Sequence, residues 1–157
     1  MEAQLASQLA QLIRSTRQAS LATLHNGAPF VSMALVAPSP DLSTYYLHIS
    51  RLAQHTHDIE ADPRVSIMFM EKDDGSADPQ QLSRISLMGR AFKVGSGDLD
   101  YPQASTAYLK RFPASASYFT FSDFYLFRVR AESGRFVAGF AKAMDLNTDD
   151  LKQASQT

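Results

Sequence analysis

The first stretch of the chain has the hydrophobic spacing of an amphipathic helix. Leu5, Leu9, Leu12 and Ile13 recur at intervals of three and four residues within residues 2–18. This spacing places them on one stripe of a helix, and such a stripe packs against a hydrophobic core. We therefore expect an N-terminal helix that acts as a lid on the core.

Two short apolar runs then flank a turn sequence. The run ASLATL occupies residues 19–24, HNG occupies 25–27, and a second apolar run covers 30–37. Asn and Gly tolerate the positive φ that a type I′ turn requires at both of its central positions. The pattern predicts a β-hairpin, which is the clearest hairpin signal in this sequence.

More strands follow, separated by polar segments and by one helix. Three runs have the β-branched and aromatic composition of strands, at residues 44–50, 64–71 and 84–94. Ser50 is suited to be the N-cap of a helix over 51–62, which ends before Pro63. Residues 72–81 are too polar to be buried and should form a surface loop. Gly89 interrupts the last of these strands as a bulge or as a site of close backbone approach.

The C-terminal part of the chain adds a helix and a last pair of strands. A helix is expected over residues 98–112, where Pro102 fits only in the first turn. Residues 124–130 and 135–141 are predicted to pair across a short connector of ordinary hairpin length. The tail after Asn147 is predicted to form one more short helix.

Together these elements describe a single, mainly β domain over residues 1–157. One hairpin opens the chain and another closes it, and too few crossover helices alternate with the strands for a doubly wound parallel sheet. The expected architecture is a closed antiparallel barrel with peripheral helices. We find no internal repeat and no domain boundary.

Composition narrows the range of functions. The chain carries 15 Lys and Arg against 16 Asp and Glu, a net charge of −1, without the basic stripe that nucleic acid binding uses. Zero cysteines exclude disulfides, thiolate zinc sites, Cys-ligated iron–sulfur clusters and a cysteine nucleophile. Because no secretory leader or long apolar run occurs, we expect a cytoplasmic protein without a membrane partner.

Several common activity motifs do not occur. The tripeptide at 95–97 lacks the third glycine of the dinucleotide fingerprint, and there is no P-loop and no GxSxG elbow. The acidic residues around Gly75 miss the ligand order of a calcium loop. His55 and His57 lie two apart on the predicted helix and so point to different faces, which predicts no metal site.

One junction between a strand and a helix has the groups of an anion site. The first N–H groups of a helix lack intrahelical partners and favour negative charge, and here they would follow Ser50. Further groups suited to phosphate contact are the guanidinium groups of Arg51 and Arg84 and the hydroxyls of Ser32 and Thr56. A structural cap is the commoner explanation of such a junction, and His48 and His55 are either ligand contacts or interior histidines.

Three segments taken in order carry a resemblance to a known family. They are ASLATL-HNGAPFVSMALV, YLHISRLAQHTHDIEADPRVSIMF and RISLMGRA, which span about residues 19–91. In this order they resemble the pyridoxamine 5′-phosphate oxidase-like FMN-binding split-barrel family. The later segments YLKRFP, DFYLFRV and GRFVAGFAKA, within residues 108–143, resemble more narrowly the haem-utilisation branch of that family.

The resemblance implies a six-stranded antiparallel split β-barrel that forms a homodimer, with FMN in clefts at the subunit interface. The positions that match cofactor contacts of the family are Ala22, Thr23, Ser32, Met33, His48, Ile49, Ser50, Arg51, Leu52, Ala53, His55, Thr56 and Arg84. Arg51, Arg84 and the amides near Ser50 would hold the phosphate, while His48 or His55 would contact the flavin. No catalytic acid or base is assigned.

The chain departs from the family pattern at several positions. The vitamin-producing oxidases have basic residues where Ser32, Ala37 and Leu52 stand, and they have a C-terminal Trp and Arg pattern, whereas this chain has no Trp. In the haem-utilisation branch a tail histidine resembles the haem ligand, but no histidine follows His57 here. These departures argue against oxidation of pyridoxamine 5′-phosphate and against haem binding through a tail histidine.

Three functions remain open at this point. The leading one is an FMN-dependent oxidoreductase that passes electrons between a reductant and an unidentified small substrate, with FMN supplying the redox chemistry. The second is a homodimer that binds or degrades haem through a ligand other than a tail histidine. The third is a split-barrel binding protein without catalytic turnover.

Overall fold

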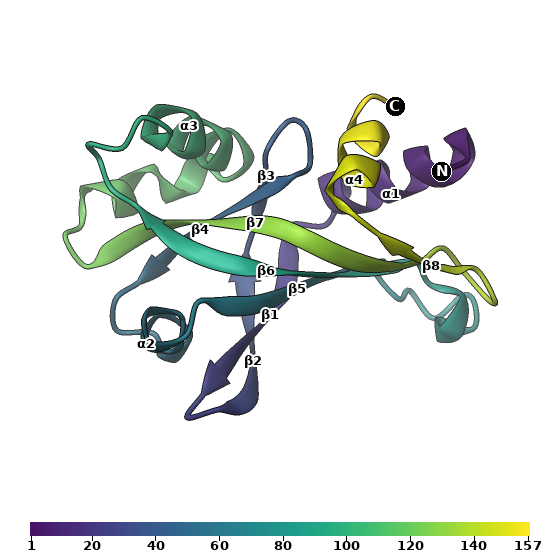
Figure 1. Cartoon of the computed structure of the whole chain (residues 1–157), viewed down its shortest axis with the longest axis horizontal. Coiled ribbons are helices and arrows are strands. Elements are labelled where there is room, and N and C mark those ends of the chain that lie inside the picture. Colours follow the sequence, from purple (N-terminus) through teal and green to yellow (C-terminus); the bar gives the residue numbers. More distant parts are fainter.

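One strongly curved antiparallel sheet organises the computed structural model, which describes all 157 residues (Figure 1). Its strand order is β2-β1-β5-β6-β7-β4-β3, and β8 pairs with the C-terminal part of β7. The strands are β1 (Gln18–His25), β2 (Ala28–Leu35), β3 (Ala37–Pro38), β4 (Thr44–Ser50), β5 (Arg64–Met70), β6 (Arg84–Val94), β7 (Phe124–Val137) and β8 (Ala143–Leu146). The mainly β split barrel is confirmed, with eight strands in place of six.

The helices gather at two ends of this sheet. They are α1 (Ala3–Ser15), α2 (Gln54–Ala61), α3 (Tyr101–Arg111) and α4 (Thr148–Ser155), with two 3₁₀ segments, η1 (Pro79–Gln81) and η2 (Pro113–Thr120). Figure 1 shows α1, α4 and β8 at one end, and α2 and α3 at the other. None of these helices combines the length and the apolar character needed to cross a membrane.

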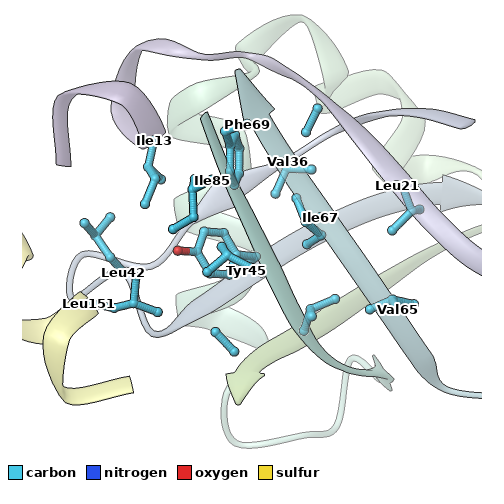
Figure 2. Packing of buried hydrophobic residues seen from close by; sticks show 14 of the residues in the cluster. Ile13, Leu21, Val36, Leu42, Tyr45, Val65, Ile67, Phe69, Ile85 and Leu151 are labelled. Carbon is cyan, nitrogen blue, oxygen red and sulfur yellow. The ribbon is translucent and has the colours of Figure 1, made fainter. Parts of the chain in front are cut away.

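The main hydrophobic core lies inside the curve of the sheet. Leu9, Leu12 and Ile13 of α1 are buried in it, so the predicted apolar stripe is confirmed as a lid. Figure 2 shows Ile13 of α1 and Leu151 of α4 directed into the same core as the side chains of the strands. A second, smaller core lies under α3 and consists of Ala37, Tyr46, Val94, Ala104, Tyr108, Phe112 and Leu126.

The hairpin predicted around the Asn-Gly turn is confirmed, and so is the irregularity predicted at Gly89 in β6. Asn26 and Gly27 have φ of 52° and 80°, as a type I′ turn requires, and β1 and β2 pair along their whole length. The pairing of β6 with β7 shifts register between Met88 and Gly89. A Cβ at Gly89 would lie 2.1 Å from the carbonyl oxygen of Arg130, so Gly89 is a site of close backbone approach, and the bulge itself lies opposite it in β7.

The prediction of a last hairpin between residues 124–130 and 135–141 is wrong. Residues 124–137 form one continuous strand, β7, residues 138–141 lie in the turn that follows, and the hairpin is between β7 and β8. Across the bulge Ala131 pairs with Gly89 and Ser133 with Met88, which leaves Glu132 as the extra residue. The segment 132–134 has the composition of a turn, but it forms a β-bulge within a strand.

The remaining elements agree with the sequence patterns. α3 lies within the predicted residues 98–112 and has its proline in the first turn. The loop over 72–81 is exposed and contains only η1. The tail after Asn147 forms α4, and Asn147 and Asp150 make a capping box at its start.

Candidate functional site

The junction between β4 and α2 leaves backbone groups free. α2 begins at Gln54 with Ala53 as its N-cap, so the prediction that Ser50 caps this helix is wrong. Ser50 Oγ instead accepts a hydrogen bond from the Leu52 N–H at 3.2 Å, because a turn separates the strand from the helix. Ala53 has no side-chain oxygen, and the N–H groups of Gln54 and His55 have no acceptor in the protein.

Arg51 supplies an unpaired cation in the turn that precedes these N–H groups. Its backbone N–H donates to the Asp123 carbonyl at 2.6 Å, which ties the turn to the segment that leads into β7. Its side chain is exposed, and its guanidinium takes part in none of the ion pairs of the structure. A guanidinium next to unpaired helix N–H groups is suited to bind a phosphate or a carboxylate.

Ser32 and His55 come together at this junction from distant parts of the chain. Ser32 Oγ lies 3.0 Å from His55 Nδ1, a contact that joins β2 to α2. Burial lowers the pKa of His55, and the negative charge of Asp58 offsets only part of this shift. The neutral ring is therefore favoured at physiological pH. Thr56 is buried, and its hydroxyl donates to the Ser50 carbonyl at 2.6 Å, so its role is to hold the helix in place.

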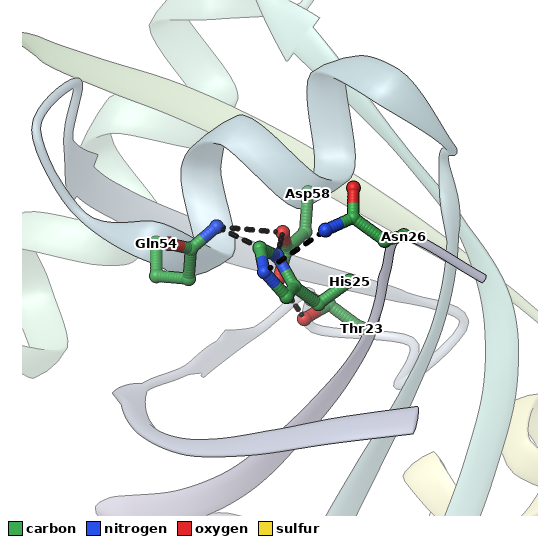
Figure 3. A network of polar contacts seen from close by, with 5 residues as sticks. All are labelled: Thr23, His25, Asn26, Gln54 and Asp58. Carbon is green, nitrogen blue, oxygen red and sulfur yellow. Dashed lines mark hydrogen bonds and ion pairs between the residues drawn. The ribbon is translucent and has the colours of Figure 1, made fainter. Parts of the chain in front are cut away.

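A buried polar network fixes α2 to β1 (Figure 3). Asp58 is its centre: one carboxylate oxygen accepts from Thr23 Oγ1 at 2.9 Å, and the other lies 2.8 Å from His25 Nδ1 and 2.9 Å from Gln54 Nε2. Burial alone would raise the pKa of Asp58, but hydrogen bonds from these three side chains, led by that of His25, bring it below its usual value. The carboxylate is therefore ionised and acts as an acceptor.

His25 and Asp58 are site residues that sequence reasoning missed. They are 33 positions apart, one at the end of a strand and the other in the middle of a helix. No local spacing connects such positions, because only the packing of α2 against the hairpin brings them together. The one available signal is that a histidine directly precedes the Asn-Gly turn, where any polar residue is tolerated.

His48 belongs to a different environment. Its ring stacks on that of Phe119 with centroids 3.8 Å apart, and Tyr108 and Phe124 also lie against it. Burial lowers the pKa of His48 to about 4, and its Nδ1 is buried without a partner. The next residue, Ile49, points into the main core. Within one chain, neither residue joins the free groups at the start of α2.

Three other predicted site residues also lie apart from this junction. Arg84 begins β6, which β1 and β5 separate from β2, and its Nη1 donates to the Leu82 carbonyl at 3.0 Å. Ala22 and Met33 lie on the outer face of the sheet. The structure thus gathers Ser32 and the segment from Ser50 to Thr56, while Thr23 supports that segment through Asp58.

The outer face of β2, β1, β5 and β6 has several large exposed apolar side chains among polar ones. Its large exposed side chains are those of Val31, Met33, Met70, Met88 and Phe92, which are 47–64% exposed. A hollow of about 400 Å³ lies between β1, β2 and β5 and is lined mainly by Val31, Met33, Met68 and Met70. Large apolar side chains exposed together on one face are typical of an interaction surface.

Comparison with protein families decides the relationship. The model of the family described as pyridoxamine 5′-phosphate oxidase matches residues 5–138. The chain belongs to this family. The resemblance found in the sequence is therefore confirmed, and it extends over the barrel and over the junction at α2.

Similar proteins of the family have names that refer to haem. The chain is 28% identical over 153 residues to heme oxygenase HutZ of Vibrio cholerae, covering 96% of this chain and 86% of that protein. It is 33% identical over 121 residues to the chloroplastic non-canonical heme oxygenase HOZ of Arabidopsis thaliana, covering 76% of this chain and 35% of that protein. A solved structure of a heme binding protein from Mycobacterium smegmatis superimposes with a TM-score of 0.84 at 25% identity, covering 98% of this chain and 61% of the other.

Proposed function

We propose that this chain binds haem and takes part in its oxidative degradation, as a homodimer. The observation that carries the proposal is the start of α2, where two N–H groups and the Arg51 guanidinium have no protein partner. Such a site holds an anionic group, and both haem and FMN have one. The names of the two sequence relatives favour haem, in place of the FMN-dependent oxidoreductase that the sequence suggested first.

The charges at the junction support a propionate over a phosphate. Arg51 is the one arginine or lysine between Ser50 and Thr56. By the family resemblance, the vitamin-producing oxidases have basic residues at three further positions, where this chain has Ser32, Ala37 and Leu52. Here Ser32 is bonded to His55, Ala37 is fully buried, and Leu52 is exposed. A single guanidinium matches one carboxylate well and a phosphate dianion less completely. Bound haem would supply an iron that reacts with dioxygen once an external reductant has reduced it.

The uncovered outer face of the sheet supports the homodimer. A second copy laid on β2, β1, β5 and β6 would bury the exposed valine, methionine and phenylalanine side chains. Replacing Met33 and Met88 with lysine puts charges on this face, and we expect sedimentation to show a monomer. A wild-type protein that sediments as a monomer would contradict this part of the proposal.

Titration with haem and with FMN in parallel tests the cofactor. We expect a haem absorbance band that survives gel filtration, and about tenfold weaker binding in Arg51→Gln, the loss of one charge-assisted contact. Lys152→Gln is the matched control, because Lys152 is an exposed cation on α4 at the other end of the molecule. Haem-loaded protein supplied with ascorbate and oxygen should then lose the band and release iron.

FMN binding is the second candidate, because the same free N–H groups can donate to a phosphate. The family is also named for pyridoxamine 5′-phosphate oxidase, an enzyme that uses FMN. A yellow protein that takes up FMN and leaves haem in solution would support this function. Binding of neither cofactor would favour a split-barrel protein without turnover. Haem that is bound but stays intact under reductant and oxygen would restrict the function to haem binding.

A further inference from the structure

The four histidines of the chain differ in what holds their rings. His48 stacks in an aromatic cluster, His55 contacts the Ser32 hydroxyl, and His57 is exposed on α2. His25 alone has its ring held by a carboxylate, with Nδ1 lying 2.8 Å from Asp58 Oδ1. The structure therefore singles out His25 as a histidine whose orientation is set by a second residue.

The network around Asp58 determines which nitrogen of His25 carries the proton. Asp58 is 4% exposed, and its carboxylate oxygens accept hydrogen bonds from Thr23 and Gln54. We therefore assign the proton of the 2.8 Å contact to Nδ1 of His25, although the Gln54 amide nitrogen also lies 2.9 Å from Nδ1. In the tautomer with the proton on Nδ1, the neutral ring has a lone pair on Nε2, and the one protein contact of Nε2 is the Asn26 amide of the turn at 3.3 Å. The side chain of His25 is 45% exposed, so a ligand can reach this nitrogen once the turn amide moves aside.

A neutral imidazole oriented by a carboxylate is the usual arrangement of a metal-ligating histidine. Such histidines donate their second N–H to a carboxylate or a carbonyl, which sets the tautomer and makes the ligating nitrogen more basic. A hydrogen bond to a single buried carboxylate, itself held by Thr23 and Gln54, meets this requirement. The structure has no group of three or more His, Cys, Asp or Glu side chains that could hold a metal ion by themselves, so a single histidine suits an iron already held by a porphyrin.

The position of His25 matches the free anion site. Gln54, whose amide contacts both His25 and Asp58, is the first residue of α2 and has one of the two free backbone N–H groups. Beside His25 lies the ring of Phe30, with centroids 6.2 Å apart, and Phe30 is 37% exposed. One end of α2 thus offers a nitrogen ligand, an apolar ring and donors for a carboxylate.

We propose that His25 ligates the haem iron through Nε2 and that Asp58 is the positioning residue that orients and polarises it. This inference rests on the proposed function and extends it, because it assigns the iron ligand in a chain that has no histidine after His57. It also explains why a carboxylate is buried beneath a half-exposed histidine at the end of a hairpin.

The first test compares His25→Ala with the control His57→Ala, which removes an exposed histidine from the same end of the molecule. We expect His25→Ala to bind haem at least tenfold more weakly and to lose the absorbance and iron–histidine Raman signals of a histidine ligand. Imidazole added to His25→Gly should restore them. His57→Ala should behave as the wild type. A His25→Ala protein with wild-type affinity and spectrum would overturn the assignment.

Asp58→Asn tests the positioning role with a readout that packing alone would not move. The amide keeps the shape of the side chain but cannot make the ring of His25 as basic, so the iron should remain histidine-ligated with a higher reduction potential. An unchanged potential in a folded Asp58→Asn protein would overturn the role of Asp58. If that variant does not fold, Gln54→Ala, which removes one donor to the same carboxylate, should shift the potential in the opposite direction.

The failures of the two proposals are distinguishable. A wild-type protein that takes up no haem overturns the proposed function and this inference together. Haem uptake that depends on Arg51 but is indifferent to His25 leaves the proposed function standing and overturns the inference alone.

Discussion

Two helices of this molecule begin in opposite ways. α4 starts at Asn147, whose side chain accepts from two backbone N–H groups while Asp150 reaches back to the Asn147 N–H. α2 starts at Ala53, which has no capping side chain, and its first turn has no acidic residue. The donors of α4 are consumed by its own sequence, whereas those of α2 stay available to a ligand.

α2 is stable without a cap because it is held elsewhere along its length. Thr56 donates to the Ser50 carbonyl, and Asp58 accepts from Thr23 and His25 on β1. These bonds fix the helix to the sheet while leaving its first N–H groups unpaired. The comparison shows that a helix start keeps its donors free when tertiary contacts take over the task of the cap.

Removing the anchor of α2 should have the largest effect on stability. Asp58→Ala takes away an ionised acceptor and leaves the buried Thr23 hydroxyl without a partner, which should cost about 1.5–3 kcal/mol of unfolding free energy. Urea denaturation followed by circular dichroism measures this loss. A change below about 0.5 kcal/mol, as for an ordinary surface substitution, would mean that the packing of α2 alone holds it.

Giving α2 a cap should remove the difference between the two helices. In Ala53→Asp the new carboxylate would accept from the free N–H groups and repel an anionic ligand. We expect haem affinity to fall about tenfold, equivalent to about 1.4 kcal/mol, while the helix gains up to about 1 kcal/mol of stability. Calorimetric titration and thermal unfolding check the two parts. Unchanged affinity in a stabilised variant would show that these donors do not face the ligand.

The reverse experiment removes the cap of α4. Asn147→Ala should lower the unfolding free energy by about 1 kcal/mol, because two N–H groups lose their acceptor. Haem affinity should not change, because α4 lies at the other end of the molecule. Denaturant midpoints measured beside haem titrations test both statements. Loss of ligand binding would indicate that the two ends are coupled.

The smallest effect concerns pH. The pKa of Asp58 is lower in the folded protein than in the unfolded chain, so the charged carboxylate stabilises the fold above its unfolded pKa. That contribution is lost as the pH falls through the folded pKa. Unfolding free energies measured from neutral pH downward should therefore decline less steeply in Asp58→Asn than in the wild type. Parallel curves for the two proteins would contradict this.

Local patterns were sufficient for most elements of the fold. The stripe of α1, the Asn-Gly turn and the proline in the first turn of α3 each act within a few residues, and the structure agrees with all three. The error at β7 has a non-local cause. Glu132 and its neighbours have turn composition, but the bulge that they form depends on Gly89 in the adjacent strand.

The candidate site was predictable in part, for the same reason. The residues from Ser50 to Thr56 are consecutive in the sequence, so their proximity to one another could be predicted without the tertiary structure. The contacts of Ser32 with His55 and of His25 with Asp58 span 23 and 33 positions and were not predictable from spacing. The resemblance to the family indicated Ser32, but Asp58 and His25 became visible only in the folded molecule.

By itself, the sequence determined the class of the fold, its first hairpin, its helices and the position of the junction between β4 and α2, because these depend on local backbone preference and hydrophobic period. The tertiary structure alone decided that the donors of α2 stay free, that His48 is enclosed by aromatic rings, and that a buried carboxylate orients His25. Those outcomes arise from packing between segments far apart in the chain, which no local pattern encodes.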